Sequence, residues 1–303
     1  MLTDIEFLAD DGTELRGWLF EPDHYSGPRP TIIMAHGITG VKELLEHVAE
    51  AFCAAGFAVV LYDHRCWGSS GGLPRRDVDP VAQARDMRAA ITFAETVPRV
   101  DEKRIGLWGT SFAGAHVLQV AAADQRVRCV VSQVPMIRGY QNFATLLSTE
   151  DLVALQQQLI AEQRARFDGA EPLKIPVSSA DPDQPHALPG ARTHWYLNHS
   201  PNTGRSPDWS NEITLRSLGW ALDYDVAASV PRISPTPLLM IVAEHDMLTP
   251  TNLALEAFES ARQPKQLVLI PGDHYAPYHE EFDLCSSAAV DFFTEHLIET
   301  QPA

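Results

Sequence analysis

A serine occupies a position where the sequence predicts an abrupt turn from a strand into a helix. The segment 105–116 reads IGLWGTSFAGAH, in which an apolar run ends at Gly109 and Ser111 follows two residues later. The small residues Ala113 and Gly114 allow a helix to begin directly against the strand. This is the G-x-S-x-G type of nucleophile turn, with Ala113 in place of the second glycine. The pattern predicts that the Ser111 hydroxyl is exposed for attack on a carbonyl carbon.

A serine hydroxyl becomes a useful nucleophile only when a base removes its proton and an acid holds that base in place. After a turn of this type, the acid is expected to follow a later strand and the histidine the strand after that. The apolar run Leu238–Ala243 is followed by Asp246, and the run Gln266–Ile270 is followed by His274. We therefore predict that Asp246 is the acid and His274 the base.

Other residues near these strand ends are alternatives for the acid. Glu244 is closer to the end of its strand, and Asp273 is adjacent to the predicted base. Both are more readily explained as helix-capping or solvated carboxylates. His245 would have to turn back toward its own neighbour, so it is not the predicted base.

Two backbone N–H groups are candidates for binding the oxyanion of a tetrahedral intermediate. The first is that of Phe112, at the start of the predicted helix. The second is that of Ile38, in the glycine-containing loop 34–40. We expect His36 to stabilise this loop by hydrogen bonding. The segment 63–70 is expected to brace the serine turn, with Arg65 binding carbonyl or carboxylate groups there and not the substrate.

The elements that must position these residues follow a recognisable order. Two strand-like segments, 4–9 and 14–20, flank an Asp-Gly turn and predict a hairpin. From residue 30 onward, short apolar runs alternate with segments of helical periodicity, which is typical of β-α-β units on a parallel sheet. The apolar runs are Thr31–Ala35, Ala58–Tyr62, Ile105–Trp108, Cys129–Val134, Leu238–Ala243 and Gln266–Ile270. The sequence thus predicts an α/β fold with a mostly parallel, twisted sheet and helices on both faces.

Several helix boundaries are also indicated. A stripe that includes Leu44 and Phe52 ends at Gly56, which suits a left-handed turn. Asp79 and Pro80 form a typical helix start. The last helix is expected from about Ser286 onward.

The alternation of strands and helices stops between residues 137 and 235. We interpret residues 1–136 and 236–303 as the core and residues 137–235 as a helical cap. Ser148 is expected to begin one helix, and a second helix is predicted at about 211–224. Between them, residues 172–207 are rich in Pro, Asp and Ser and are expected to form a loop. Such a segment is suited to serve as a lid over a site.

Aromatic residues in or beside this cap could line an acyl-binding pocket. The candidates for substrate contact are Tyr140, Trp195, Trp209 and Tyr275. Phe143, Tyr196, Trp220 and Tyr278 belong to the same group. For each one singly, packing of the cap onto the core is the simpler explanation.

The overall composition excludes several classes of protein. Forty acidic residues against 23 Lys and Arg give a net charge of −17, which disfavours nucleic-acid and anionic-membrane partners. Four cysteines form no C-x-x-C pair, and His194 and His199 are not spaced to share a helical face. We expect no metal and no cofactor. The first residues do not resemble a signal peptide and no stretch approaches a membrane span, so a soluble cytoplasmic protein is expected.

The combined motifs resemble those of the α/β-hydrolase superfamily. They are Ala35-His36-Gly37, Asp63-x-Arg65-x-x-Gly68-x-Ser70, Gly109-x-Ser111, Asp246 and His274. The chain is also similar to a narrower group of small hydrolases that includes fungal polyketide thiohydrolases and polyketide transferases. This second resemblance includes Val41-Lys42-Glu43, the segment 130–135 and the segment 211–218. It implies cleavage of an ester or thioester, or transfer of an acyl group, with an acyl group of polyketide type.

These observations favour a serine hydrolase that forms an acyl-enzyme on Ser111. The expected partner is a small-molecule acyl ester or thioester, either free or bound to a carrier protein. One alternative passes the acyl group to an alcohol, and another uses His274 for C–C bond cleavage or proton transfer without an acyl-enzyme. A mere binding module is disfavoured because the serine, aspartate and histidine are all present. The oligomeric state stays open between a monomer and a homodimer.

Overall fold

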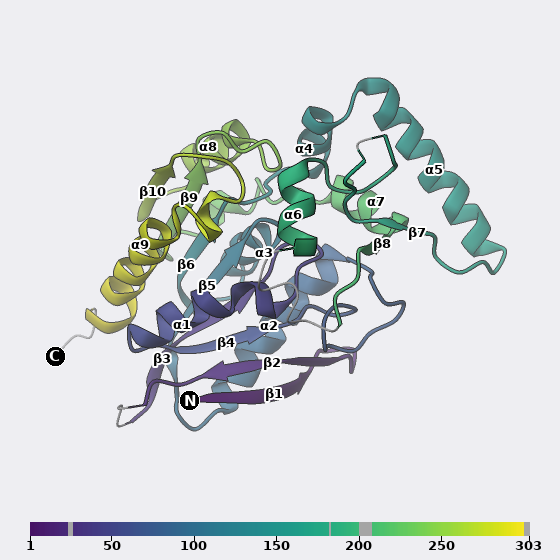
Figure 1. Cartoon of the computed structure of the whole chain (residues 1–303). Coiled ribbons are helices and arrows are strands. Elements are labelled where there is room, and N and C mark those ends of the chain that lie inside the picture. Colours follow the sequence, from purple (N-terminus) through teal and green to yellow (C-terminus); the bar gives the residue numbers. More distant parts are fainter. Residues whose placement is uncertain (24–26, 182, 200–207, 300–303) are drawn as a thin grey trace.

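One large sheet forms the centre of the computed structural model, which describes residues 1–23, 27–181, 183–199 and 208–299 (Figure 1). Within these ranges its eight strands have the order β1-β2-β4-β3-β5-β6-β9-β10. Their bounds are β1 Leu2–Leu8, β2 Glu14–Phe20, β3 Arg29–Ala35, β4 Ala58–Tyr62, β5 Val100–Thr110, β6 Val127–Gln133, β9 Leu238–Ala243 and β10 Lys265–Ile270. β2 is antiparallel to both β1 and β4, and the remaining neighbours are parallel. The predicted hairpin and the predicted parallel sheet are both confirmed.

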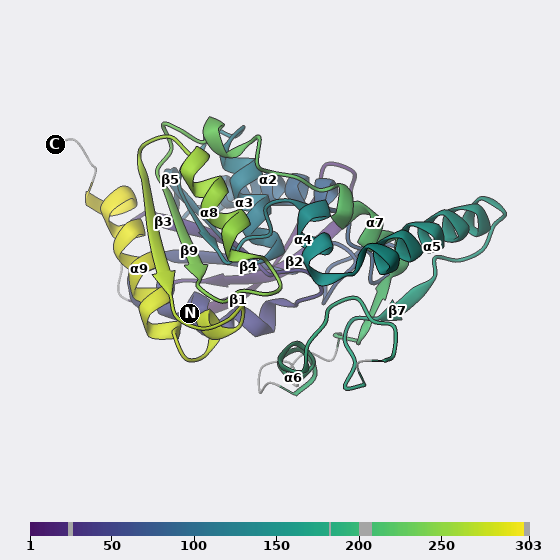
Figure 2. The ribbon, with the colours of Figure 1, turned by 90° about the horizontal axis from the view of Figure 1, so that it is seen from above.

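Helices cover both faces of this sheet, which explains why its central strands read as continuous apolar runs. Every residue of β3, β4 and β9 is buried. Helices α1 (Glu46–Ala54) and α9 (Phe282–Thr294) lie on one face, and α2 (Pro80–Thr96), α3 (Phe112–Ala121) and α8 (Thr251–Ser260) lie on the other (Figure 2). Aromatic rings in edge-to-face contact join the first two helices, since the ring centroids of Phe52 and Phe293 are 5.6 Å apart.

The ends of these helices follow the local signals in the sequence. Gly56 has a φ of +100° just beyond α1. The Asp79 carboxylate accepts hydrogen bonds from the backbone N–H groups of Val81 and Ala82, both at 3.0 Å, and so caps α2. Short 3₁₀ turns occur at η1 (Lys42–Leu45), η3 (Val230–Arg232) and η4 (Ala276–Tyr278), and η5 (Glu295–Glu299) is a π-helical turn after α9. Helix α9 begins at Phe282, one turn earlier than expected from the sequence.

The chain between β6 and β9 folds outside the sheet, beyond the carboxyl ends of its parallel strands (Figure 1). Its described part contains the helices α4 (Gly139–Leu146), α5 (Thr149–Phe167), α6 (Ala191–His199) and α7 (Leu215–Asp223), and the strand pair β7 (Lys174–Pro176) and β8 (Glu212–Thr214). Ser148 caps α5 as expected, because its hydroxyl accepts a hydrogen bond from the Asp151 backbone N–H at 3.1 Å. We refer to this part of the chain as the cap.

Two expectations about the cap were wrong. The segment 172–207 is not a simple loop, because it contains β7 and α6; residues 182 and 200–207 lie outside the described part. The helix expected from residue 211 begins at Leu215, since Glu212–Thr214 pairs with β7 instead. Strands β7 and β8 have three residues each and α6 has nine, and their sequences carry little periodicity. They form because Tyr196, Leu197 and Ile213 are buried against the rest of the protein.

Helix α5 is the most prominent projection of the molecule in both views (Figures 1 and 2). It packs against α7 through a face on which Leu152 is buried and Leu155 and Leu159 are half-buried. Its outer side exposes Val153, Ile160 and Phe167. None of the helices in the described ranges, α5 included, is long and apolar enough to cross a membrane.

Candidate active site

The turn after β5 places a strained serine at the start of α3. Ser111 has φ +57° and ψ −118°, and the end of strand β6 and the segment after it hold its backbone on both sides. Its N–H donates to the Gln133 carbonyl at 2.8 Å, and its carbonyl accepts from the Met136 N–H at 3.1 Å. A Cβ on Gly109 would lie 2.3 Å from the Ala113 carbonyl oxygen, so only glycine fits there. The backbone around Ser111 is therefore fixed by the neighbouring strand.

The structure brings Ser111, His274 and Asp246 into one hydrogen-bonded chain. His274 Nε2 lies 3.1 Å from Ser111 Oγ, and His274 Nδ1 lies 2.7 Å from Asp246 Oδ2. The acid follows β9 and the histidine follows β10, so parallel strand ends position both. The side chains are shielded from water, with residue exposures of 9% for Ser111, 5% for Asp246 and 6% for His274.

The loop after β9 holds the Asp246 carboxylate from several directions. Asp246 Oδ1 accepts hydrogen bonds from the N–H groups of Leu248 at 2.9 Å and Thr249 at 2.8 Å. Thr249 Oγ1 lies 2.8 Å from Asp246 Oδ2 and 3.2 Å from His274 Nδ1. These contacts fix the carboxylate facing the imidazole. Sequence reasoning missed Thr249, although its place three residues after the predicted acid, just before a helix, is a usable signal.

The alternative acids lie elsewhere. The side chain of Glu244 is exposed, as is that of His245. Asp273 accepts a hydrogen bond from the Tyr275 N–H at 2.9 Å, and its other oxygen pairs with Arg192 at 3.0 Å. Neither carboxylate faces the His274 imidazole.

The loop after β3 passes directly against the serine. A Cβ on Gly37 would lie 2.9 Å from Ser111 Cβ, so the absence of a side chain permits this approach. Ile38 and Phe112 line the same cavity as Ser111. Phe112 is the first residue of α3, and its N–H therefore has no carbonyl partner one turn earlier in the helix. Both predicted oxyanion groups thus belong to segments that flank the serine.

Buried hydrogen bonds hold this loop in place. His36 Nε2 accepts from the His64 N–H at 3.2 Å, which leaves Nδ1 to donate to the Gly37 carbonyl at 2.9 Å. Burial lowers the pKa of His36, so its imidazole is neutral. Lys42 Nζ binds Asp63 Oδ2 at 2.8 Å below the loop. These contacts agree with the structural role expected for His36.

Arg65 also has its expected role as an anchor. Its Nε donates to Asp86 Oδ2 at 2.7 Å, and its Nη1 donates to Asp11 Oδ2 at 2.7 Å. The guanidinium thereby joins α2 to the turn of the N-terminal hairpin. Arg65 does not belong to the lining of the cavity.

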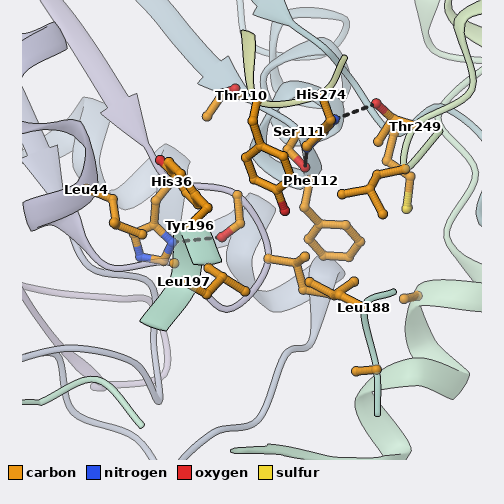
Figure 3. Close-up of a pocket in the computed structure, with 18 of the residues that line it drawn as sticks. His36, Leu44, Thr110, Ser111, Phe112, Leu188, Tyr196, Leu197, Thr249 and His274 are labelled. Carbon is orange, nitrogen blue, oxygen red and sulfur yellow. Dashed lines mark hydrogen bonds between the residues drawn. The ribbon is translucent and has the colours of Figure 1, made fainter. Parts of the chain in front are cut away.

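A cavity of about 850 Å³, its open mouth included, lies between the serine and the cap (Figure 3). Figure 3 shows Ser111 and His274 on one side and the cap residues Leu188 and Leu197 on the other. The lining is mostly apolar, and its residues are His36, Gly37, Ile38, Gly40, Leu44, Leu45, Thr110, Ser111, Phe112, Met136, Asn142, Phe143, Leu146, Ala187, Leu188, Tyr196, Leu197, Ala221, Leu248, Thr249, His274, Tyr275 and Tyr278. It is suited to an uncharged, largely apolar group.

The structure places only one of the four candidate substrate residues on this lining. Tyr275 lines the cavity. Tyr140 and Trp195 are 53% and 46% exposed and do not belong to the lining, and Trp209 donates from Nε1 to the Thr39 carbonyl at 2.9 Å instead. The helical phase of α4 and α6 determines which of their aromatic side chains face the cavity. Phe143 and Tyr196 line it in place of Tyr140 and Trp195.

Two cap residues bind the loops that carry the acid and the histidine. Asn142 of α4 donates from Nδ2 to the Leu248 carbonyl at 2.7 Å. Arg192 of α6 pairs with Asp273 at 3.0 Å and with Glu280 at 2.6 Å. The position of the cap is thereby coupled to the loops of Asp246 and His274.

The described ranges contain no group of three or more His, Cys, Asp or Glu side chains arranged to hold a metal ion. His194 Nδ1 lies 3.2 Å from Ser178 Oγ, and the ring centroids of His194 and His199 are 5.4 Å apart.

Comparison with known proteins identifies close relatives over nearly the whole chain. Polyketide transferase grgF of a Penicillium species is 31% identical over 298 residues, covering 97% of each chain. Thiohydrolase aneE of Aspergillus aculeatus is 30% identical over 274 residues, covering 88% of this chain and 83% of the relative.

Solved structures agree with these sequence matches. The crystal structure of the α/β hydrolase GrgF from Penicillium sp. sh18 matches with a TM-score of 0.85, covering 98% of this chain and 99% of that one. DcsB in complex with its substrate analogue matches with a TM-score of 0.86 and 28% identity, over 98% and 99% of the two chains. A family model described as X-Pro dipeptidyl-peptidase (S15 family) matches residues 11–276. The chain therefore belongs to this S15 family and has the α/β-hydrolase fold.

Proposed function

We propose that the protein is a serine hydrolase that cleaves an ester or thioester through an acyl-enzyme on Ser111. The observation that carries the proposal is the hydrogen-bonded chain from Ser111 Oγ through His274 to Asp246, at 3.1 and 2.7 Å. Hydrolases that use this arrangement activate the serine by proton transfer to the imidazole.

The reaction would proceed in two halves. Ser111 Oγ attacks the acyl carbonyl carbon while His274 Nε2 takes the hydroxyl proton, and the N–H groups of Ile38 and Phe112 stabilise the oxyanion. The oxyanion then collapses, the bond to the leaving oxygen or sulfur breaks, and His274 returns the proton to that atom. A water molecule, deprotonated by His274, repeats the sequence and releases the acid. Asp246 keeps the imidazole oriented and stabilises its positive charge.

The lining of the cavity favours an ester or thioester over the peptide substrate suggested by the family description. A dipeptidyl-peptidase must bind the charged N-terminal ammonium group of a peptide, and burying that charge requires a partner. Among the described residues, the lining contains neither Asp nor Glu. The relatives named thiohydrolase and polyketide transferase support an acyl substrate of polyketide type, free or on a carrier.

The proposal predicts a covalent intermediate that mass spectrometry detects. The protein is incubated with a panel of acyl esters and thioesters, and the Ser111 peptide is expected to gain the mass of the acyl group before the acid is released. Ser111→Ala should abolish the mass gain and lower the rate by about 10⁴-fold or more. Ser287→Ala, which changes an exposed serine on α9, is the matched control and should behave like the unmodified protein. Turnover that continues without Ser111 would contradict the proposal and favour C–C cleavage or proton transfer by His274.

A second candidate is acyl transfer to an alcohol. It is favoured by the relative named polyketide transferase and by the apolar cavity, which could exclude water from the acyl-enzyme. Adding a series of alcohols to the reaction distinguishes the two routes. An ester product at the expense of the free acid would identify a transferase, whereas unchanged release of the acid would identify a hydrolase.

A further inference from the structure

Two hydroxyl groups meet in the wall of the cavity beside the nucleophile. Thr110 immediately precedes Ser111, and Tyr278 follows His274 by four residues. Their hydroxyl groups are hydrogen-bonded to each other. The residues are only 2% and 7% exposed, and both line the cavity. The site is thus built from the end of β5, next to the proposed nucleophile, and from the turn η4, which follows the proposed base.

The two hydroxyl groups of this pair have more hydrogen atoms to donate than acceptors to receive them. Gln133 Nε2 donates to Thr110 Oγ1 at 3.3 Å, so it supplies a further hydrogen and no acceptor. The two hydroxyl groups carry one hydrogen each, and their mutual bond uses one of them. Whichever group donates in that bond, the hydrogen of the other has no acceptor among the described residues. One hydroxyl hydrogen is therefore surplus.

A surplus donor in a buried, mostly apolar wall is costly unless a ligand satisfies it. Burial raises the pKa of Tyr278, so its hydroxyl keeps its hydrogen at neutral pH. Two other donors on the lining have partners among the described residues: the Asn142 amide nitrogen donates to the Leu248 carbonyl, and the Tyr275 hydroxyl interacts with Thr193. Asn142 Oδ1, by contrast, is a buried acceptor without a partner among these residues. The Thr110–Tyr278 pair thus presents a donor for which the described part of the chain supplies no acceptor.

We propose that this pair binds a second oxygen of the acyl group, so that the preferred substrate is an oxygenated acyl ester or thioester and not a plain fatty acyl one. The inference rests on the proposed function and adds the chemistry of the acyl group. Thr110 is the neighbour of Ser111 in the chain, with Cα atoms about 3.8 Å apart, and both residues line the cavity, so the pair is expected to face the start of an acyl chain attached to Ser111. The oxygen is therefore expected on one of the carbons that follow the acyl carbonyl.

The experiment compares matched substrates on matched variants. The substrates are N-acetylcysteamine thioesters of hexanoate and of its 3-oxo, 4-oxo and 5-oxo derivatives, and kcat/KM is measured for each. The unmodified protein should prefer at least one oxo substrate over hexanoyl beyond the ratio of their uncatalysed hydrolysis rates. In the double variant Thr110→Val/Tyr278→Phe, this preference should fall by about 3- to 10-fold, the value of one neutral hydrogen bond.

The single variants and a control complete the design. Each single replacement leaves the other hydroxyl as a donor. The variant that changes the ratio of kcat/KM between oxo and hexanoyl substrates therefore identifies the hydroxyl that contacts the substrate. Tyr275→Phe removes a hydroxyl from the same wall outside the pair, and the preference should persist. Labelling of Ser111 by a fluorophosphonate shows that each variant is folded.

Each outcome decides the inference. An equal loss of activity toward all four substrates in the double variant would mean that the pair is only structural, and would overturn it. If the double variant does not fold, the unmodified protein still tests the inference through its preference for oxo substrates, corrected for their uncatalysed hydrolysis rates. If the unmodified protein shows no such preference, the inference is overturned. Cleavage of none of the thioesters would instead count against the proposed function itself.

Discussion

At the scale of single residues, Thr249 connects both partners of the serine. Its Oγ1 lies within hydrogen-bond distance of Asp246 Oδ2 and of His274 Nδ1. It also lies 3.0 Å from the Val134 carbonyl, which anchors it to the end of β6. Thr249 is therefore a positioning residue: it touches neither the serine nor the acyl carbon, but it fixes the acid relative to the imidazole.

Replacing this hydroxyl tests that role. Thr249→Val keeps the shape and removes the hydrogen bonds, so kcat/KM should fall by about 10-fold, the value of roughly 1.4 kcal/mol. Thr249→Ser retains the hydroxyl and should restore most of the rate. The measurement is kcat/KM for a cleaved ester, together with thermal unfolding of each variant. Equal rates for the valine and serine variants would show that the hydroxyl does not position the acid.

At the scale of elements, helix α6 is fastened to the loop that carries His274. The Arg192 guanidinium pairs with Asp273 and Glu280, and the Tyr196 ring lies 4.8 Å from that of Tyr275, measured between centroids. The side chains in these ion pairs are partly exposed, at 37% for Arg192 and 61% for Glu280, so water screens the attraction. The pairs thus orient α6 over the cavity and contribute little to stability.

Arg192→Met removes the charge and keeps the length of the side chain. We expect KM to rise several-fold because α6 is less well held over the cavity, while kcat changes less than about twofold. Added salt should raise KM of the unmodified protein and have a smaller effect on the variant. Lys174→Met, which breaks an exposed ion pair within the cap, is the control. A fall in kcat with unchanged KM would show that Arg192 acts on the hydrogen-bonded chain of Ser111, His274 and Asp246 and not on substrate binding.

The elements that the sequence predicted well are those with a purely local cause. The central strands were evident because a strand covered on both faces must be apolar throughout, and the strand ends then indicated Ser111, Asp246 and His274. Helix α6 and strands β7 and β8 were not evident, since only tertiary burial of a few residues stabilises them. The choice between Trp195 and Tyr196 depended on the phase of a helix that had no sequence signal. The Thr110–Tyr278 bond joins residues 168 positions apart, so no local pattern could show it.

At the scale of the whole molecule, three histidines are buried next to one another beneath the candidate active site. The ring centroids of His36 and His64 are 4.6 Å apart, and those of His64 and His116 are 5.5 Å apart. Burial lowers the pKa of all three, that of His116 to about 3. Three neutral imidazoles therefore share one core region, where added positive charge would be unfavourable.

These histidines predict acid sensitivity of folding. In the unfolded chain an imidazole binds a proton below a pH of about 6.5, whereas buried His116 stays neutral until about pH 3. The unfolded state thus binds more protons in this window, so the free energy of unfolding falls as the pH drops below about 6.5. Urea unfolding between about pH 7 and pH 5 measures the slope.

His116→Gln should make that slope shallower by up to about 1.4 kcal/mol per pH unit, since one titrating group is lost. Glutamine retains polar atoms for Gln83 and Tyr224, which hydrogen-bond the imidazole at 3.1 and 2.8 Å. Parallel slopes for the two proteins would show that His116 does not contribute to the pH dependence.

The projecting helix α5 has a practical consequence for engineering the protein. Its outer end turns at Gly169, where a φ of +95° and open space around the Cα position mark an uncrowded surface bend. No residue of α5 lines the cavity. Additional sequence, such as a fluorescent reporter or an affinity tag, can be inserted at this bend with the chemistry left intact. The same bend offers an attachment point for immobilising the protein through a segment that does not line the cavity.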